Sequence, residues 1–138
     1  MRALLDANVL VSAALSARGA PARLIKAWLS GQFELVVSPA LLGELERVLA
    51  YPKIRSRIQQ DDAAALLELL RDAALLLDDP DGEPPVAVSD PDDRYLVVLA
   101  ASARAILVTG DAALLRLAEQ QIPVYSPAAF EQTLRSTN

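Results

Sequence analysis

In the stretch Leu4-Leu5-Asp6-Ala7-Asn8-Val9-Leu10-Val11, a single carboxylate interrupts an apolar run. Residues 2–6 predict a buried strand, and Asp6 lies at its carboxyl end, the edge of an open α/β sheet where ligands bind. Burying a charge there is costly unless the charge is paired or bound to a metal ion. Asp6 is therefore a candidate ligand. The alternative is an aspartate that caps a turn or helix through its side chain, which Asn8 would assist.

Further apolar runs alternate with amphipathic stretches along the chain. Together they predict strands at residues 2–6, 34–37, 75–78, 106–109 and 123–125. Runs such as Leu35-Val36-Val37 are continuous rather than alternating, which is typical of parallel strands with helices on both faces. The pattern predicts the fold class α/β, a three-layer α/β/α sandwich around a central, mostly parallel sheet of about five strands.

Capping and breaking residues mark the helices between these strands. Gly31 ends the first helix, Ser38 and Pro39 begin the second, and Pro52 breaks the pattern after it. The expected helices cover residues 20–30, 39–50, 61–74, 91–103, 112–120 and the segment after Ser126-Pro127. The stretch 79–91 predicts a surface loop, because its prolines and glycine break both periodicities.

Composition limits the chemistry of this chain. Its 138 residues include no histidine and no cysteine, which excludes Ser-His-Asp, Cys-His and thiolate-zinc sites. The length suits one domain over residues 1–138, and a hydrophobic share of 53% excludes a disordered chain. No apolar run is long enough to span a bilayer, and the N-terminus resembles no secretory signal. The sequence therefore predicts a cytoplasmic protein that makes no membrane contact.

Other acids occur in settings comparable to that of Asp6. Asp93 precedes the core-facing stripe of its expected helix, and Asp111 follows the expected strand 106–109. Both also suit helix starts, where acids are favoured. Glu44 and Glu46 lie on opposite flanks of the apolar arc of the helix at 39–50, and periodicity does not choose between them.

Convergence of these acids would create a metal site. Several carboxylates at the ends of neighbouring strands repel one another strongly at low dielectric unless a cation lies among them. Ligand sets made only of oxygen favour Mg²⁺ or Mn²⁺. Such an ion can activate water and stabilise charge on an attacked phosphodiester. The sequence thus predicts metal-dependent phosphodiester hydrolysis that requires no side-chain general base.

Charge is segregated along the chain, whose net charge is −5. That sum argues against a simple nucleic-acid binder, because phosphates call for a basic face. Residues 78–93 hold seven acids and no base. Residues 47–57 hold no acid and four bases, Arg47, Lys53, Arg55 and Arg57. Solvated surface and contact with a nucleic-acid backbone are both open interpretations of this basic run.

Four blocks of sequence contain the candidate acids. They are Leu-Leu-Asp6-Ala-Asn8-Val-Leu-Val-Ser-Ala, Glu-Leu-Val-Val-Ser38-Pro39-Ala-Leu-Leu-Gly-Glu44-Leu, Asp90-Pro-Asp92-Asp93-Arg-Tyr-Leu and Leu-Val-Thr109-Gly110-Asp111-Ala-Ala-Leu-Leu. In this order and at these intervals they resemble the PIN-domain ribonucleases, specifically the small bacterial toxins of toxin–antitoxin operons. An isolated Asp-x-Asn is a weak signal, whereas the four blocks together are specific and span nearly the whole chain.

The resemblance implies roles for individual residues. The family's four acids fall on Asp6, Glu44, Asp93 and Asp111. The resemblance therefore favours Glu44 over Glu46. Asn8 and Thr109 match polar positions beside the metal, and Asp90 and Asp92 belong to an acid-rich version of the third block. The family further implies dependence on Mg²⁺ or Mn²⁺, RNA as substrate, homodimers and inhibition by a cognate antitoxin.

The leading hypothesis is a metal-dependent endoribonuclease that acts as the toxin of a toxin–antitoxin pair. A second is a catalytically inactive PIN scaffold that serves as a protein-binding module, which intact acids at all four positions disfavour. A third is a phosphatase with Asp6 as covalent nucleophile. Such enzymes, similar to haloacid dehalogenases, require an aspartate where Asn8 stands.

Overall fold

Five short parallel strands form one sheet in the computed structural model, which describes residues 1–137. They are β1 (Arg2–Leu5), β2 (Glu34–Val37), β3 (Leu75–Leu76), β4 (Ile106–Val108) and β5 (Val124–Tyr125). Their order across the sheet is β3-β2-β1-β4-β5, so β1 lies at the centre. The parallel sheet confirms the fold class that the sequence predicts. Residue 138, the last residue of the single domain expected over 1–138, lies outside the described residues.

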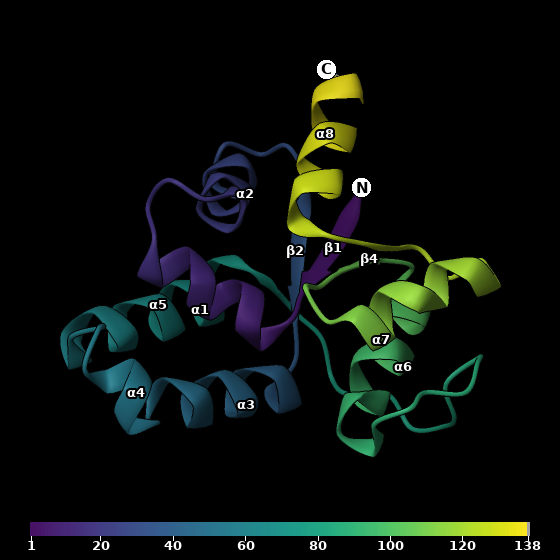
Figure 1. Ribbon diagram of the computed structural model, residues 1–138, viewed down its shortest axis with the longest axis horizontal. Coiled ribbons are helices and arrows are strands. Elements are labelled where there is room, and N and C mark those ends of the chain that lie inside the picture. The colour runs from purple at the N-terminus through teal and green to yellow at the C-terminus, as the bar shows by residue number, and fades with distance from the viewer. Residues whose placement is uncertain (138) are drawn as a thin grey trace.

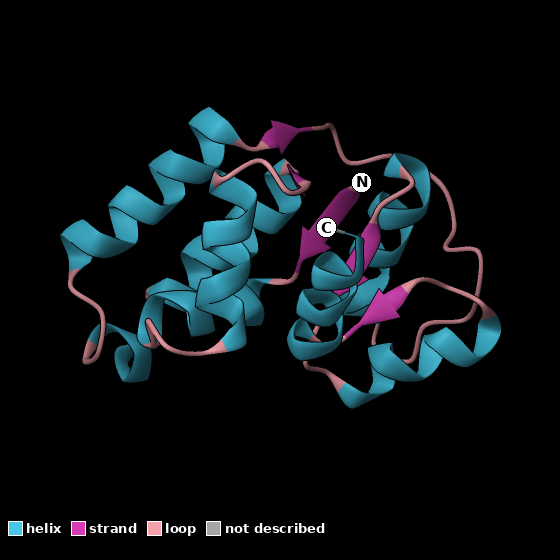
Figure 2. Cartoon of the chain, turned by 90° about the horizontal axis from the view of Figure 1, so that it is seen from above, coloured by secondary structure: helices cyan, strands magenta, loops and turns pink. Residues whose placement is uncertain are grey.

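Helices cover both faces of the sheet and complete three layers (Figures 1 and 2). The helices of residues 1–137 are α1 (Ala7–Leu15), α2 (Ala20–Leu29), α3 (Pro39–Leu49), α4 (Pro52–Arg55), α5 (Gln60–Ala73), α6 (Arg94–Ala103), α7 (Ala112–Leu115) and α8 (Pro127–Thr137), with 3-10 helices η1 (Pro91–Asp93) and η2 (Arg116–Gln120). In Figure 1, α1, α3 and α5 lie on one side of the strands, and α6 and α7 lie on the other. None of these helices combines the length and the apolar character needed to cross a membrane.

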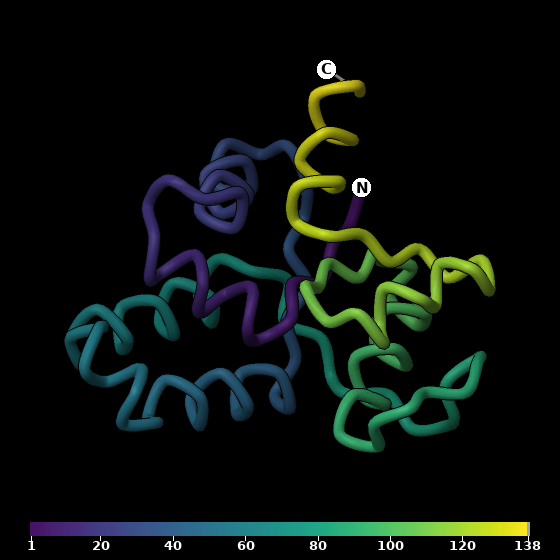
Figure 3. Tube along the Cα trace, viewed as in Figure 1, coloured from purple at the N-terminus to yellow at the C-terminus, as the bar shows by residue number. Residues whose placement is uncertain are grey.

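The strands are buried because helices pack on both of their faces. Leu4 and Leu5 of β1 and Val36 of β2 are 0% exposed, as the continuous apolar runs predict. In the register of the sheet, Leu5 lies opposite Val108. Since all the strands are parallel, their carboxyl ends meet at one edge, and the turns that follow β1 and β4 lie side by side there (Figure 3).

Helix ends follow the predicted capping residues. Ser38 Oγ accepts the backbone N–H of Leu41 at 3.3 Å at the start of α3, and Ser126 Oγ accepts that of Ala129 at 3.1 Å in the first turn of α8. Gly31 follows α2 with a φ of +86°, in the left-handed region that glycine adopts without strain. The predicted caps of these three helices are confirmed.

Two helices, α1 and α4, are not predicted from the sequence. The buried residues of α1 are Ala7, Val9, Leu10 and Val11. An apolar run buried in this way has no clear periodicity to distinguish a helix from a strand. The single turn of α4 begins at Pro52, because a proline that ends one helix can occupy the first position of the next.

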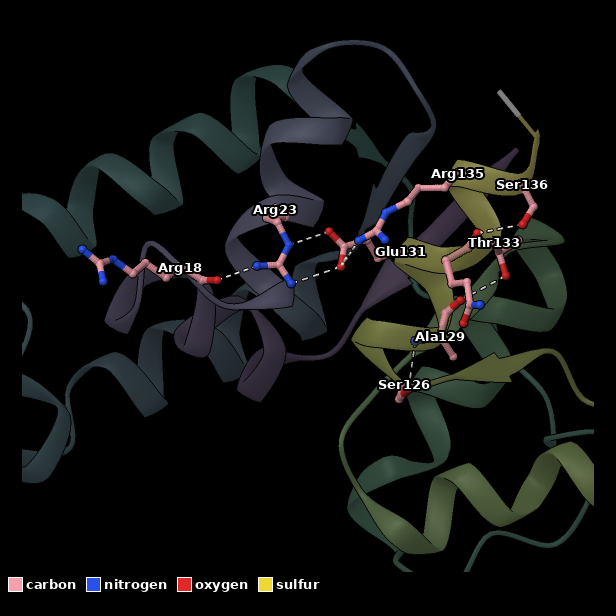
Figure 4. A network of polar contacts seen from close by, with 9 residues as sticks. Arg18, Arg23, Ser126, Ala129, Glu131, Thr133, Arg135 and Ser136 are labelled. Carbon is pink, nitrogen blue, oxygen red and sulfur yellow. Dashed lines mark hydrogen bonds and ion pairs between the residues drawn. The ribbon is translucent and has the colours of Figure 1, made fainter.

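The last helix, α8, packs against α2 beside the amino ends of β1 and β2 (Figure 1). Phe130 is 0% exposed and meets Phe33 edge to face, with ring centroids 5.2 Å apart. Above this contact, Glu131 accepts two hydrogen bonds from the Arg23 guanidinium, at 2.6 and 3.1 Å (Figure 4). Arg135 lies 3.1 Å from the same carboxylate. Aromatic packing and a fully compensated acid thus hold the end of the chain in place.

Candidate metal centre

Asp6 directly follows the central strand and is 6% exposed. Its Oδ1 accepts the backbone N–H of Val9 at 2.9 Å and so caps α1, and its Oδ2 accepts a hydrogen bond from the Thr109 hydroxyl. Burial raises the pKa of Asp6 above its ordinary value, although the hydrogen bonds from Thr109 and Val9 lower it. Asp6 therefore caps a helix, as in the alternative interpretation, and this contact coexists with burial that disfavours a bare charge.

The second strand end brings Asp111 to the same edge. Asp111 caps α7, because its Oδ1 accepts the backbone N–H groups of Ala113 and Leu114 at 2.8 and 3.1 Å. Its own N–H donates to Thr109 Oγ1 at 3.1 Å. Thr109 is 0% exposed and connects the two acids, since the same hydroxyl donates to Asp6. The Asp111 Oδ2 atom has no hydrogen-bond partner within residues 1–137 and is available to a ligand.

Glu44 and Glu46, which periodicity leaves equivalent, have different surroundings. Glu44 is half-buried and accepts a hydrogen bond from the Tyr95 hydroxyl on α6. Its negative charge raises the pKa of Asp6 and of Asp93. Glu46 points away from these acids and lies 3.6 Å from Arg71 of α5, with 64% of its side chain exposed. Of the two glutamates, only Glu44 belongs to the acid group.

Asp93 begins α6 and is half-buried. Its pKa rises to about 6, mainly because of burial and further because of the negative charges of Asp90, Asp111, Glu44 and Asp6. Its side chain makes no capping hydrogen bond. Asp90 instead caps the preceding turn by accepting the backbone N–H of Asp92 at 3.0 Å. Asp90 and Asp92 are exposed, at the rim of the group.

The structure therefore gathers Asp6, Glu44, Asp93 and Asp111 from four separate segments of the chain. In the described residues, none of these four acids forms an ion pair with a lysine or arginine. Within residues 1–137, however, no three acids are spaced closely enough to hold one metal ion. The donor set fits Mg²⁺ or Mn²⁺ in its chemistry, because all of its atoms are carboxylate oxygens and its charge is uncompensated. The four carboxylates therefore lie near one another, but they are not spaced to hold one ion in this conformation.

A cleft of about 510 Å³ opens beside Glu44. Its lining residues are Ala40, Glu44, Arg47, Tyr51, Asp92 and Tyr95. Of the four bases in the predicted RNA-binding run, only Arg47 lines this cleft. Lys53, Arg55 and Arg57 lie further along the chain, on and just after α4, and all are exposed. Asn8, predicted to support the metal site, is exposed in the first turn of α1.

Two tyrosines of this region are not assigned a role by the sequence. Tyr95 contacts Glu44 across two helices, and its pKa is raised by burial and by that hydrogen bond, so it remains a neutral donor. Tyr51 lies two residues after α3 and immediately before α4. No local periodicity identifies a contact between helices so far apart in sequence. The one sequence feature that links Tyr95 to the site is its position two residues after Asp93.

These features define an α/β/α domain with an acidic centre at the carboxyl edge of a parallel sheet. A sequence model of the PIN domain family matches residues 2–113, a range that contains all four gathered acids. The chain belongs to the PIN domain family.

Comparison with solved structures supports the fold. The chain is similar to one in the crystal structure of VapBC2 from Rickettsia felis bound to a DNA fragment from their promoter, with a TM-score of 0.62. The match covers 91% of this chain and 98% of that chain at 14% sequence identity, so the likeness concerns the fold. No curated protein sequence matches this one.

Proposed function

We propose that this protein is a metal-dependent endoribonuclease that acts as the toxin of a toxin–antitoxin pair. One observation carries the proposal: four carboxylates, from the ends of β1 and β4 and from α3 and α6, gather and form no ion pair with a lysine or arginine of the described chain. Acids with raised pKa values in such a cluster are typical of functional sites. Membership of the PIN family supports a nuclease.

In this proposal, Asp6, Glu44, Asp93 and Asp111 hold Mg²⁺ or Mn²⁺. The bound ion would lower the pKa of a water molecule and stabilise the charge on the attacked phosphate. The donor set suits hard cations because it contains only oxygen atoms.

Neighbouring groups hold three of these four ligands in place. The Thr109 hydroxyl orients Asp6, the Tyr95 hydroxyl orients Glu44, and two backbone N–H groups orient Asp111. Such contacts behind metal ligands fix their direction and raise affinity. Asp93 has no such restraint, so it is the ligand whose side chain can turn to close the group. Asn8, Asp90 and Asp92 would support the site from its rim.

The basic run gives the proposed substrate a path to the acids. Arg47 lies one turn after Glu44 on α3, in the cleft, and makes no ion pair within residues 1–137. We assign Arg47, Lys53, Arg55 and Arg57 to contacts with the RNA backbone, which their charge favours. Arg55 is the least available, because its guanidinium donates to the Gln60 side chain at 3.3 Å.

The toxin role extends the proposal to partners. The similar structure is described as VapBC2 bound to promoter DNA, and by analogy we propose a cognate antitoxin as the protein partner of this chain. A homodimer and a cytoplasmic location complete the proposal, and both rest on the family resemblance and on the composition of the sequence.

One observation favours a second candidate, the inactive PIN scaffold that binds a protein partner. In the described residues, the acids do not form a set of three spaced for one ion. A scaffold that no longer binds metal has no need for such spacing. The two candidates differ in whether the acids close around an added ion.

The test is cleavage of labelled total RNA by purified protein in Mg²⁺ or Mn²⁺, with EDTA as the control. We expect fragments that require the metal and are lost in Asp6→Asn. Glu44→Gln and Glu46→Gln form a matched pair on one helix, and only Glu44→Gln should abolish cleavage. Circular dichroism checks that each variant is folded. Absence of cleavage with either metal, in folded protein free of antitoxin, would overturn the nuclease in favour of the scaffold.

A further inference from the structure

One face of α3 continues past the end of the helix into the cleft beside Glu44. Ala40, Glu44, Arg47 and Tyr51 recur at intervals of four, three and four residues, and all line the cleft. This spacing places side chains in one row along a helix. Tyr51 ends the row about 10 Å from Glu44, at a rise of ~1.5 Å per residue. The row therefore leads from a candidate metal ligand to an aromatic ring.

The Tyr51 side chain is not needed to build the core. It is 48% exposed, and its hydroxyl has no hydrogen-bond partner in residues 1–137. Its backbone stabilises the turn that begins α4, because the Tyr51 carbonyl accepts hydrogen bonds from the N–H groups of Ile54 and Arg55 at 2.9 and 2.8 Å. Any residue could supply that carbonyl. The exposed ring is thus available for a ligand that enters the cleft.

The charges of the cleft indicate what kind of group can occupy it. Glu44 and Asp92 contribute two carboxylates, and Arg47 contributes one cation. A backbone phosphate can pair with Arg47 but would be repelled by a free carboxylate such as Asp92, whereas a neutral base would not be repelled there. The exocyclic amino group of a base can donate a hydrogen bond to a carboxylate, as cytosine does to Asp or Glu. Tyr51 supplies the flat apolar face that an unpaired base needs for stacking.

We propose that Tyr51 is a stacking platform for an unpaired base of the RNA substrate, with Asp92 accepting a hydrogen bond from the amino group of that base. This inference rests on the proposed ribonuclease function. Because Tyr51 lines the same cleft as Glu44, the base on its ring would belong to a nucleotide beside the one whose phosphate is held at the acids. A paired base is already stacked on its neighbours and cannot reach the ring. The cleft therefore selects single-stranded RNA.

Binding experiments on uncut RNA test the platform. The ligand is a labelled single-stranded oligonucleotide built around a cleavage site mapped with the wild-type protein, and Asp6→Asn is the non-cleaving background. We expect Tyr51→Ala to weaken binding roughly tenfold or more. Tyr51→Phe keeps the ring, so this variant should bind the oligonucleotide as tightly as the protein with an unchanged Tyr51. Leu76→Ala removes an equally exposed apolar side chain on β3, 49% exposed, and should have no effect.

Further measurements distinguish stacking of one base on Tyr51 from nonspecific binding of the oligonucleotide. Removal of single bases along the oligonucleotide should weaken binding to the Asp6→Asn protein at one position, and Tyr51→Ala should abolish that difference. Replacing cytosine by uracil at that position should weaken binding, and Asp92→Asn should reduce this preference. Pairing the oligonucleotide with its complement should weaken binding to Asp6→Asn protein. The loss should be smaller when Tyr51→Ala is also present.

The outcomes separate this inference from the proposed function. Equal binding by Tyr51 and Tyr51→Ala, in a protein that cleaves RNA, overturns the platform and leaves the nuclease intact. Weak binding by Tyr51→Phe overturns stacking in favour of a hydroxyl contact. Absence of metal-dependent cleavage by the wild-type protein overturns the nuclease and the platform with it.

Discussion

Two regions of the molecule place carboxylates in opposite electrostatic surroundings. Where α8 meets α2, Glu131 receives two hydrogen bonds from Arg23 and lies beside Arg135, and these contacts lower its pKa. At the carboxyl edge of the sheet, Asp6 and Asp93 have raised pKa values because they are buried among other acids. One carboxylate is overcompensated by arginines, and the others have no cationic partner in the described chain.

The difference predicts where an added cation would act on this protein. A carboxylate paired within the chain contributes to folding whether or not a ligand is present. Gathered acids without a partner oppose folding until a cation joins them, and a site that binds metal strongly often carries that cost. The acidic centre is therefore expected to respond to metal ions, and the α2–α8 contact is not.

The largest expected effect is stabilisation of the acidic centre by metal. At a Mn²⁺ concentration about 100 times the dissociation constant, wild-type protein should gain about 2.7 kcal/mol of unfolding free energy. Thermal melts with and without Mn²⁺ measure the gain. Asp93→Asn should lose most of it, and Glu131→Gln should keep it. An equal gain in Asp93→Asn would contradict a site at these acids.

A smaller effect is expected from the residue that orients Glu44. Tyr95→Phe removes the hydroxyl and keeps the ring, and we expect RNA cleavage to fall about tenfold, the lower end of the usual effect of such contacts. The Mn²⁺ concentration for half-maximal rate should rise, because Glu44 loses its fixed direction. The matched control is Tyr125→Phe on β5. A lower rate with unchanged metal dependence would exclude a positioning role for Tyr95.

The raised pKa of Asp93 predicts how stability without metal depends on pH. Its pKa rises from 3.8 to about 6 on folding, so between these values the native state binds more protons than the unfolded state. Unfolding free energy therefore decreases as pH increases through this window. In EDTA, urea denaturation should show wild type losing about 1 kcal/mol relative to Asp93→Asn between pH 4 and pH 6, allowing for solvent screening. Parallel pH profiles would contradict the shift.

The smallest effect is expected at the α2–α8 contact. Glu131→Gln should lower stability slightly at neutral pH, and less so at high salt, because the pairs with Arg23 and Arg135 are exposed. Asp93→Asn in EDTA should change stability in the opposite direction. Urea denaturation at low and high salt measures both. A gain in stability from Glu131→Gln would remove the contrast between the two regions.

The predictability of the fold follows from which residues carry local patterns. Continuous apolar runs place all five strands to within two residues, because parallel strands are buried on both faces. Ser38 and Ser126 mark their helices through contacts with nearby N–H groups. The helix after Asp6 is not predicted, because an apolar run has the same appearance in a buried helix and in a strand.

The predictability of the site depends on contacts between distant segments. Periodicity leaves Glu44 and Glu46 equivalent, and the choice comes only from the family resemblance. The structure separates them through Tyr95 and Arg71, which come from other helices. The ring of Tyr51 joins the cleft in the same way. The metal-binding role of the four acids and the RNA contacts of the basic run stay predictions.

The strand order also determines when the acidic centre can form during protein synthesis. Asp6 is translated well before Thr109 and Asp111, which arrive with β4, and β4 pairs with β1 so that Leu5 lies opposite Val108. A growing chain on the ribosome can therefore pair β1 with β2, but it lacks β4 and has an incomplete set of acids until Asp111 has been translated. Any activity that needs all four acids can begin only after that point.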